Sequence, residues 1–267
     1  MNQKNMPMNQ ETDINFAPSH QPVSRRYKLI ACEIIYREIC SLIADCENII
    51  DVEFLRKGLH DAGSETMVKT IQEMVNQTDK KNYDAILLGY GRCNNGTVGL
   101  KSQEIPLVIP RAHDCITFFF GSQQAYDEYF AQNPGTFYRT TGWIERDIYD
   151  KDSVMHQMGL DRTFDQYVAQ YGIENAEYIM QSLGTWQQHY NRFVYIDMGL
   201  PLDDNYAQQT QQEARDNNME FQRLQGNSRL LRSLLSGQWS EDEFLIVPPG
   251  NEVAAEDNGK VIVSVKC

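Results

Sequence analysis

Residues 83–121 read YDAILLGYGRCNNGTVGLKSQEIPLVIPRAHDCITFFFG, and this stretch decides the fold. DAILLGY and IPLVIP are short, continuously apolar runs, which are typical of strands buried on both faces. A glycine-rich loop carrying Cys93 follows the first run, and a turn carrying His113 and Cys115 follows the second and opens a helix. Two thiols and an imidazole therefore stand just past the ends of two consecutive predicted strands.

The alternation of apolar runs with helical patterns continues on both sides of this stretch. The further runs predicted as core strands are YKLIAC (27–32), NIIDVEFL (48–55), RFVYIDMG (192–199) and FLIVPPG (244–250). Helices are predicted at 33–46, 64–77 with Ser64 as N-cap, 115–132, 205–224 and 228–235, and an edge strand or a tail at 261–267.

Strands that alternate with helices predict an α/β fold with a doubly wound, mostly parallel sheet and helices on both faces, Rossmann-like in layout. We expect a mobile tail at residues 1–25 and a single domain at residues 26–267. A helical insertion is expected after the fourth strand, around residues 145–190.

The composition excludes several classes of partner. The 267 residues include 24 Lys and Arg against 37 Asp and Glu, which gives a net charge of -13. This charge repels nucleic acid and anionic membranes. The sequence shows neither the 18 or more consecutive apolar residues of a membrane span nor an N-terminal apolar signal segment. We therefore expect a cytoplasmic protein whose six cysteines are thiols, metal ligands or catalytic groups.

Polar residues of the types that bind ligands follow each of the first four predicted strands. In an open parallel sheet, ligands bind outside the carboxyl ends of the strands, so these side chains are expected at one edge. In chain order they are Cys32, Glu33, Arg56, Lys57, His60, Tyr90, Arg92, Cys93, Asn94, Asn95, Arg111, His113, Asp114 and Cys115.

The cysteines and the histidine in these loops suggest a metal site. Zinc prefers tetrahedral Cys and His ligands, and catalytic zinc sites often use three protein ligands and one open position. His113 and Cys115 can face one ion from a shared turn, Cys93 can supply a third ligand, and Cys32 is a candidate for the fourth. An iron–sulfur cluster held by the thiolates is the alternative.

Glu33 and His60 are the remaining candidates for completing the ligand shell or for acting as a general base. A thiol site without metal is a second interpretation. Cys115 lies near a helix N-terminus, where the dipole lowers the pKa of a thiol, and His113 would act as its base. Asp114 is expected to cap the helix rather than to take part in catalysis.

The loop GYGRCNNGTVG and the following strand end contain the candidate cofactor contacts, namely Gly91, Asn94, Asn95, Gly96 and Arg111. The glycines allow positive φ and close backbone approach, and the N–H groups of such a loop can bind phosphate. The spacing matches neither the dinucleotide fingerprint nor the phosphate-binding loop, and an ordinary tight turn also explains the glycines.

The stretch GTFYRTTGWIE (135–145) is predicted to be a short strand or an ordered loop. Its residues Tyr138, Trp143 and Glu145 are candidates for a lid over the site. An aromatic cluster that packs the insertion onto the sheet explains them equally well.

Four segments together resemble a known family. The segments ACE, LGYGRCNNGTVGL, IPRAHDCITFFFGS and PGTFYRTTGWIE are similar to the bacterial and archaeal family called domain of unknown function 1638, over residues 27–250. Members usually read Cys-Gly-Asn-Gly where this chain has Cys93, Asn94, Asn95 and Gly96, which implies less room for a ligand here.

The resemblance implies a role near corrinoid-dependent methyltransferases, in methyl-group or one-carbon metabolism. A looser similarity links His113, Cys115 and Cys93 to the zinc-dependent thiol methyltransferases, although there the distant cysteine follows the His-x-Cys pair. The expected partners are a small-molecule substrate or a corrinoid or methyltransferase protein. The alternative to an enzyme is a non-catalytic binding module or chaperone for such a partner.

Overall fold

The structure is a computed structural model that describes residues 24–59, 62–93, 95–147, 168–169, 172–173, 175–178, 190–256 and 261–267. Most of the predicted tail and of the predicted insertion lies outside these residues, as do His60 and Asn94. In the part of the chain that is described, no helix combines the length and the apolar character needed to cross a membrane.

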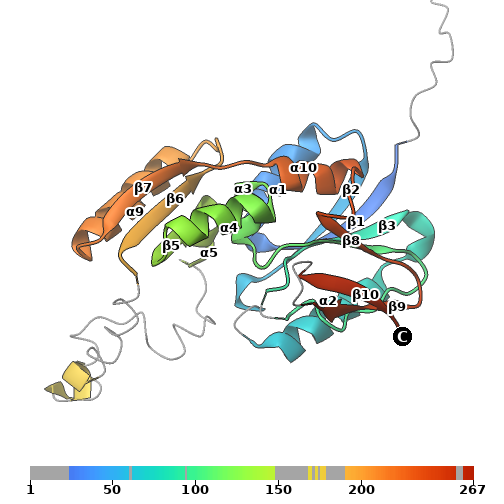
Figure 1. The fold of residues 1–267 in the computed structure, drawn as a ribbon, viewed down its shortest axis with the longest axis horizontal. Coiled ribbons are helices and arrows are strands. Elements are labelled where there is room, and N and C mark those ends of the chain that lie inside the picture. Colours follow the sequence, from blue (N-terminus) through green and yellow to red (C-terminus); the bar gives the residue numbers. More distant parts are fainter. Residues whose placement is uncertain are drawn as a thin grey trace, which may run out of the picture.

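A five-stranded sheet with the order β2-β1-β3-β4-β8 forms the centre of the fold (Figure 1). Its strands are β1 (Arg26–Cys32), β2 (Ile49–Leu55), β3 (Ala85–Gly89), β4 (Leu107–Pro110) and β8 (Phe244–Val247). β1 to β4 pair in parallel, and β8 runs antiparallel to β4. The prediction of an α/β fold with a mostly parallel sheet is therefore confirmed, with one antiparallel edge strand added.

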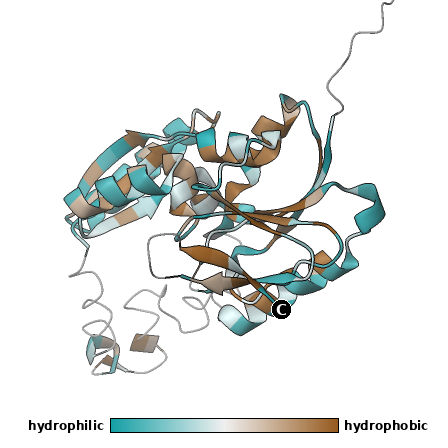
Figure 2. Cartoon of the chain, turned by 45° about the vertical axis from the view of Figure 1, so that its right-hand side comes forward, coloured by the Kyte–Doolittle hydropathy of each residue, from teal (hydrophilic) through white to brown (hydrophobic). Residues whose placement is uncertain are grey.

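Helical segments connect these strands and cover the sheet. They are η1 (Glu33–Ile35), α1 (Tyr36–Ala44), η2 (Lys57–Leu59), α2 (Ser64–Gln77), η3 (Lys80–Asn82), α3 (Ile116–Phe120) and α10 (Arg229–Ser236). In α2, Met67, Ile71 and Val75 are buried at four-residue spacing, which places one apolar stripe against the core. Figure 1 shows α1 and α10 together along one side of the sheet, with α2 toward the other. Figure 2 shows hydrophobic residues concentrated in the central strands.

A separate three-stranded parallel sheet, β5-β6-β7, lies at one end of the molecule (Figure 1). Its elements, with the helices around it, are α4 (Gln123–Gln132), β5 (Thr136–Arg139), α5 (Thr141–Asp147), β6 (Arg192–Asp197), α9 (Asp203–Asp216) and β7 (Glu220–Gln225). Two predictions were wrong here. The strand RFVYID belongs to this second sheet, and the polar helix predicted to reach residue 224 ends at Asp216, before β7.

The C-terminal residues form a two-stranded antiparallel sheet of β9 (Asn251–Ala255) and β10 (Ile262–Lys266). The single helix predicted from residue 115 to residue 132 is broken at Gly121, whose φ of 76° ends α3. Ser122 then begins α4, with its hydroxyl accepting from the Ala125 N–H. Ser64 was predicted as the N-cap of α2, but it is the first residue of the helix, and Gly63 is the N-cap residue.

Candidate functional site

Three thiols meet at the carboxyl edge of the central sheet. Cys32 ends β1, Cys93 follows β3 and Cys115 follows β4, and all three line one small cavity of about 20 Å³. A cavity of this size holds one water-sized body. β1 and β3 are neighbours from which the chain proceeds outward in opposite directions, and this is the place where such sheets bind ligands.

Backbone hydrogen bonds between two loops bring Cys93 toward Cys115. The N–H of Arg92 donates to the Ala112 carbonyl at 2.7 Å, and the N–H of Cys93 donates to the His113 carbonyl at 2.9 Å. The loop after β3 is thereby held along the loop after β4. Because these bonds join main-chain atoms, they fix the positions of the two cysteines independently of their side chains.

Glycines permit the close approach of these loops. A Cβ on Gly91 would lie 2.8 Å from the Ala112 carbonyl oxygen, and a Cβ on Gly96 would lie 2.2 Å from the sulfur of Met67. Cys93 itself has a φ of 44° and Asn95 a φ of 67°, so the loop adopts the left-handed conformation at two residues that are not glycine. The loop therefore follows a tight path that lets Met67 reach the cavity.

The thiols are enclosed, and this keeps them protonated. Burial raises the pKa of Cys32 to about 12 and that of Cys93 to about 12. Burial also raises the pKa of Cys115 well above its ordinary value, with further increases from Cys93 and the Asp114 carboxyl. This direction is opposite to the lowering predicted from a helix N-terminus, because α3 is one short turn and desolvation outweighs its dipole.

Two basic residues and an indole ring close the cavity. Lys57, which is 4% exposed, has its ammonium 5.0 Å from the centre of the Trp143 ring, and Arg56 also lines the cavity. The Lys57 charge lowers the pKa of Cys32, although the effect of burial is larger. The Trp143 indole N–H lowers the pKa of Cys115 through a hydrogen-bonding interaction with its thiol, although the effect of burial is again larger.

His113 does not join the three thiols. The residue is exposed and is absent from the described lining of the cavity, and its backbone N–H donates to the Gln123 side chain at 2.8 Å. The side chain of Asp114 accepts from the Ile116 N–H at 2.9 Å, so it binds the first N–H of α3, although Cys115 rather than Asp114 holds the N-cap position. The turn carrying His113 and Cys115 therefore directs only the cysteine into the cavity.

Glu33 lies beside the cavity and supports its wall. One carboxylate oxygen accepts from the Lys57 N–H at 2.9 Å, and the other is 3.6 Å from the Arg146 guanidinium. Glu33 is not among the described lining residues, and its carboxylate holds the segment after β2 in place. His60 and Asn94, the other candidates from these loops, lie outside the described residues.

The remaining candidate contacts make structural interactions. The Arg111 guanidinium donates to the backbone carbonyls of Glu241 and Ile262, which attaches β4 to the C-terminal segments. Asn95 is exposed, and its side-chain oxygen accepts from Arg92 at 2.6 Å. Gly91 and Gly96 are explained by the loop packing described above.

The three thiols, in the positions that they occupy in this structure, do not form a metal centre. Among the described residues, no three Cys, His, Asp or Glu side chains stand in a geometry that could hold an ion. The donor chemistry nevertheless suits a soft metal, because three thiols share one enclosed space. Holding an ion here requires the thiols to turn toward a common centre.

Two lining residues outside the strand-end loops are Met67 and Trp143. Met67 is on the buried stripe of α2, and a buried stripe does not reveal which of its members reaches a cavity. Trp143 was a lid candidate, and it does line the cavity. Tyr138, by contrast, packs among Phe120, Tyr126 and Tyr129. Glu145, the third candidate, forms a two-pronged ion pair with Arg37.

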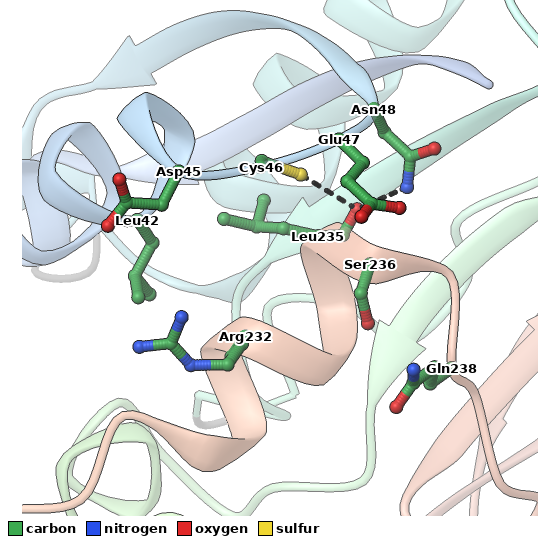
Figure 3. Close-up of a pocket in the computed structure, with 9 residues that line it drawn as sticks. All are labelled: Leu42, Asp45, Cys46, Glu47, Asn48, Arg232, Leu235, Ser236 and Gln238. Atoms are coloured by element: carbon green, nitrogen blue, oxygen red, sulfur yellow. Dashed lines mark hydrogen bonds between the residues drawn. The ribbon is translucent and has the colours of Figure 1, made fainter. Parts of the chain in front are cut away.

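A larger pocket, of about 310 Å³, opens between the C-terminal ends of α1 and α10 (Figure 3). The Cys46 thiol and the Asn48 amide that line it both donate to the Leu235 carbonyl. Asn48 directly precedes β2, so this pocket is at the amino edge of the parallel strands, away from the three thiols. Its position does not match the edge where these sheets bind ligands.

Comparison with known proteins identifies one family. A family described as "Protein of unknown function (DUF1638)" matches residues 54–235, which include Cys93, Cys115 and Trp143. No curated protein and no solved structure matches the chain.

Proposed function

The chain belongs to the DUF1638 family of proteins of unknown function, and we propose that it binds one soft metal ion, zinc in the first instance, through Cys32, Cys93 and Cys115. His113, the ligand predicted from sequence, is not part of this proposal. We propose further that the site is used in methyl-group metabolism linked to corrinoids, in the cytoplasm.

The observation that carries the proposal is the enclosure of three thiols in one cavity, one from the last residue of β1 and two from the loops after β3 and β4. Thiolates are the preferred ligands of zinc and of iron–sulfur clusters. All six cysteines of the chain are free, so none of the three is committed to a disulfide. A space of about 20 Å³ suits a single ion better than a cluster of several iron and sulfide atoms.

The charges around the cavity favour the metal-bound form. A zinc ion with three thiolates carries one net negative charge, and Lys57 and Arg56 stand beside it to compensate. Without a metal, burial keeps the thiols protonated, as the raised pKa values of Cys32 and Cys93 indicate. Metal binding is therefore expected to release protons and to be stronger at higher pH.

A bound zinc ion would supply Lewis-acid chemistry, lowering the pKa of a thiol or a water molecule in the remaining position. The chain's own residues determine what else happens in the cavity. Trp143 and Met67 exclude bulk water from the thiols, and Lys57 provides a fixed positive charge for an anionic reactant. The Glu33 carboxylate accepts a hydrogen bond from the Lys57 backbone N–H, and Glu33 is not among the described residues that line the cavity.

The test is the metal content of anaerobically purified protein, measured by mass spectrometry. We expect about one zinc per chain in the wild type and much less in Cys93→Ser and Cys115→Ser, because a tetrahedral site depends on each thiolate. Cys40→Ser is the matched control, since Cys40 is exposed on α1 and does not line the cavity. Thermal melting of every variant separates loss of metal from loss of folding.

Metal-free wild type under these conditions, or full zinc content in Cys93→Ser, would contradict the proposal. A brown protein that bleaches in air would instead indicate an iron–sulfur cluster. A zinc-loaded protein that does not transfer the methyl group of methylcobalamin to a thiol would leave the metal site standing and reject the methyl-transfer role. That result would favour the alternative function, a non-catalytic binding module for a corrinoid partner.

A further inference from the structure

We infer that the contact between α1 and α5 is a proton-sensitive hinge, in which loss of the Glu38 proton favours separation of α5 from α1 and so opens the cavity shared by the three thiols. This inference deepens the proposed function by naming how access to the same site is regulated, and it rests on that function only for the use of the cavity. Its test is made on metal-free protein, so that the hinge and the metal site are judged separately.

The first observation is a buried carboxyl group without a partner. Glu38 is on α1 and is 3% exposed, and among the described residues neither of its side-chain oxygens has a hydrogen-bond partner. Burying an ionised carboxylate without compensation is very costly, so a group in this position keeps its proton instead. Glu38 is therefore favoured in its neutral form while it is enclosed, and in its charged form when it reaches water.

The second observation is the set of charges that act on Glu38. Burial raises the pKa of its carboxyl to about 7, with further increases from Asp203 at the start of α9 and Glu145 on α5, while its own backbone N–H and the Arg37 guanidinium oppose the shift. The two other elements that pack closely on α1, η1 and α10, contribute none of these charges. An ionised Glu38 is thus repelled by carboxylates of α5 and α9, and separation of these helices from α1 relieves the repulsion.

The third observation is the direct path from α5 to the cavity. Trp143 of α5 lines the cavity, as does Ile34 of η1. The backbone of Gly142 packs on the Ile34 carbonyl, since a Cβ there would lie 1.7 Å from the carbonyl oxygen. Arg37, next to Glu38 in α1, binds Glu145 of α5 through a two-pronged ion pair. Movement of α5 away from α1 therefore takes Trp143 out of the cavity wall.

The direction of the pH effect follows from proton linkage. The carboxyl of Glu38 has its ordinary pKa of 4.5 when exposed and a pKa of about 7 when enclosed. The closed hinge is therefore most favoured below pH 4.5, and it loses this advantage as the pH rises to about 7. From these two values, the opening equilibrium should increase about tenfold between pH 6 and pH 8.

The test measures amide hydrogen exchange of reduced, metal-free protein at pH 6 and pH 8, corrected for the intrinsic pH dependence of exchange. We expect the protection of the α5 amides to fall about tenfold, because opening of the hinge releases this helix. The β9–β10 sheet is the internal reference, since it packs on β8 and takes no part in the hinge, and its protection should stay constant. Glu38→Gln and Glu38→Met cannot ionise, and either variant should abolish the fall at α5.

Glu73→Gln is the matched control. Glu73 is an exposed glutamate on α2, which is not part of the contact between α1 and α5, so this variant should behave as wild type. Access to the cavity is measured as the alkylation rate of Cys93 with iodoacetamide, in wild type relative to the two Glu38 variants. This ratio should rise about tenfold between pH 6 and pH 8, because titration of the thiol itself is common to all three proteins.

The inference is overturned if α5 of the wild type is equally protected at both pH values, if the Glu38 variants show the same fall, or if β9–β10 loses as much protection as α5. A constant alkylation ratio also overturns it. The expected pH effects in a protein that binds no zinc would retain this inference and reject the metal site. Stoichiometric zinc without any pH effect on α5 would do the reverse.

Discussion

Replacing Gly142 with alanine is expected to push α5 away from η1 and to open the three-thiol cavity. Gly142 lies in α5, directly before Trp143. A Cβ added at Gly142 would lie 1.7 Å from the carbonyl oxygen of Ile34 in η1. Ordinary contact begins at 3.4 Å, so the two backbones must separate by about 1.7 Å. The position of a Cβ is fixed by the backbone and the atom it meets is a main-chain oxygen, so no side-chain rotation relieves the overlap.

The energetic cost follows from this geometry. Overpacking of this kind costs about 1–3 kcal/mol, and backbone against backbone belongs at the upper end. Alanine is the better helix former by up to about 1 kcal/mol, which offsets part of the loss. We therefore expect the free energy of unfolding to fall by about 2 kcal/mol. With a urea m-value of about 2–3 kcal/mol/M, the unfolding midpoint drops by roughly 0.7–1 M.

A second measurement distinguishes this opening from general destabilisation. Native-state alkylation followed by mass spectrometry should modify the exposed Cys40 and Cys267 in wild type, while Cys32 and Cys93 are protected by burial. In Gly142→Ala, the displacement of Trp143 should increase the alkylation rate of Cys32 and Cys93 selectively.

Gly199→Ala is the control, because a Cβ there meets nothing within 4 Å and its φ of 76° introduces local strain alone. It should lower stability somewhat without changing the alkylation of the buried thiols. The reasoning is refuted if Gly142→Ala is as stable as wild type, or if Cys32 and Cys93 remain as protected as before.

Two further variants test buried carboxylates. Burial raises the pKa of Glu38 to about 7 from 4.5, so wild-type stability should fall by about 3 kcal/mol between pH 5 and pH 8, as the folded state loses its extra proton. Glu38→Gln should remove this dependence in urea titrations at both pH values, and an identical pH dependence in the variant would contradict it. Asp203→Asn places an amide against the N–H groups of Met198 and Leu200, now bonded at 2.9 and 2.7 Å, and should cost about 3 kcal/mol. The exposed neighbour variant Asp204→Asn should change the unfolding midpoint little, and an equal loss in both would show that those bonds are unimportant.

The strands of the central sheet were predictable because their signal is local. Five uninterrupted apolar residues at Ala85–Gly89 are all buried, and the same holds for the four residues of Leu107–Pro110. Once such strands are parallel, their carboxyl ends must share an edge. This rule alone predicted that Cys32, Cys93 and Cys115 lie near one another.

The second sheet was not predictable in the same way. The apolar run of β6 indicates a strand but carries no information about which strands it pairs with, because pairing joins residues far apart in the chain. β7 has the sequence EFQRLQ, whose polar composition after a polar helix was interpreted as a continuation of that helix. Pairing with β6 overrides this local preference.

The direction of side chains in turns was also beyond the sequence. His113 and Cys115 are two residues apart on one turn, and which of them faces the cavity depends on its backbone angles and on the hydrogen bond from His113 to Gln123. Likewise, nothing in the sequence indicates that Met67 reaches the thiols, and only the structure shows that Trp143 is the one of the three lid candidates that lines the cavity.

The amino-acid sequence by itself determined the class of fold, the position of the parallel strands and the edge at which the cysteines gather. These follow from hydrophobic periodicity, which acts over a few residues. Only the tertiary structure decided that His113 stays outside the cavity that Cys32, Cys93 and Cys115 share, and that Tyr90, Lys57 and Trp143 line the same space. Which side chains line the cavity depends on contacts between segments that are distant in the chain. At such contacts, a single backbone carbonyl, or the absence of a Cβ at a glycine, decides whether a side chain fits.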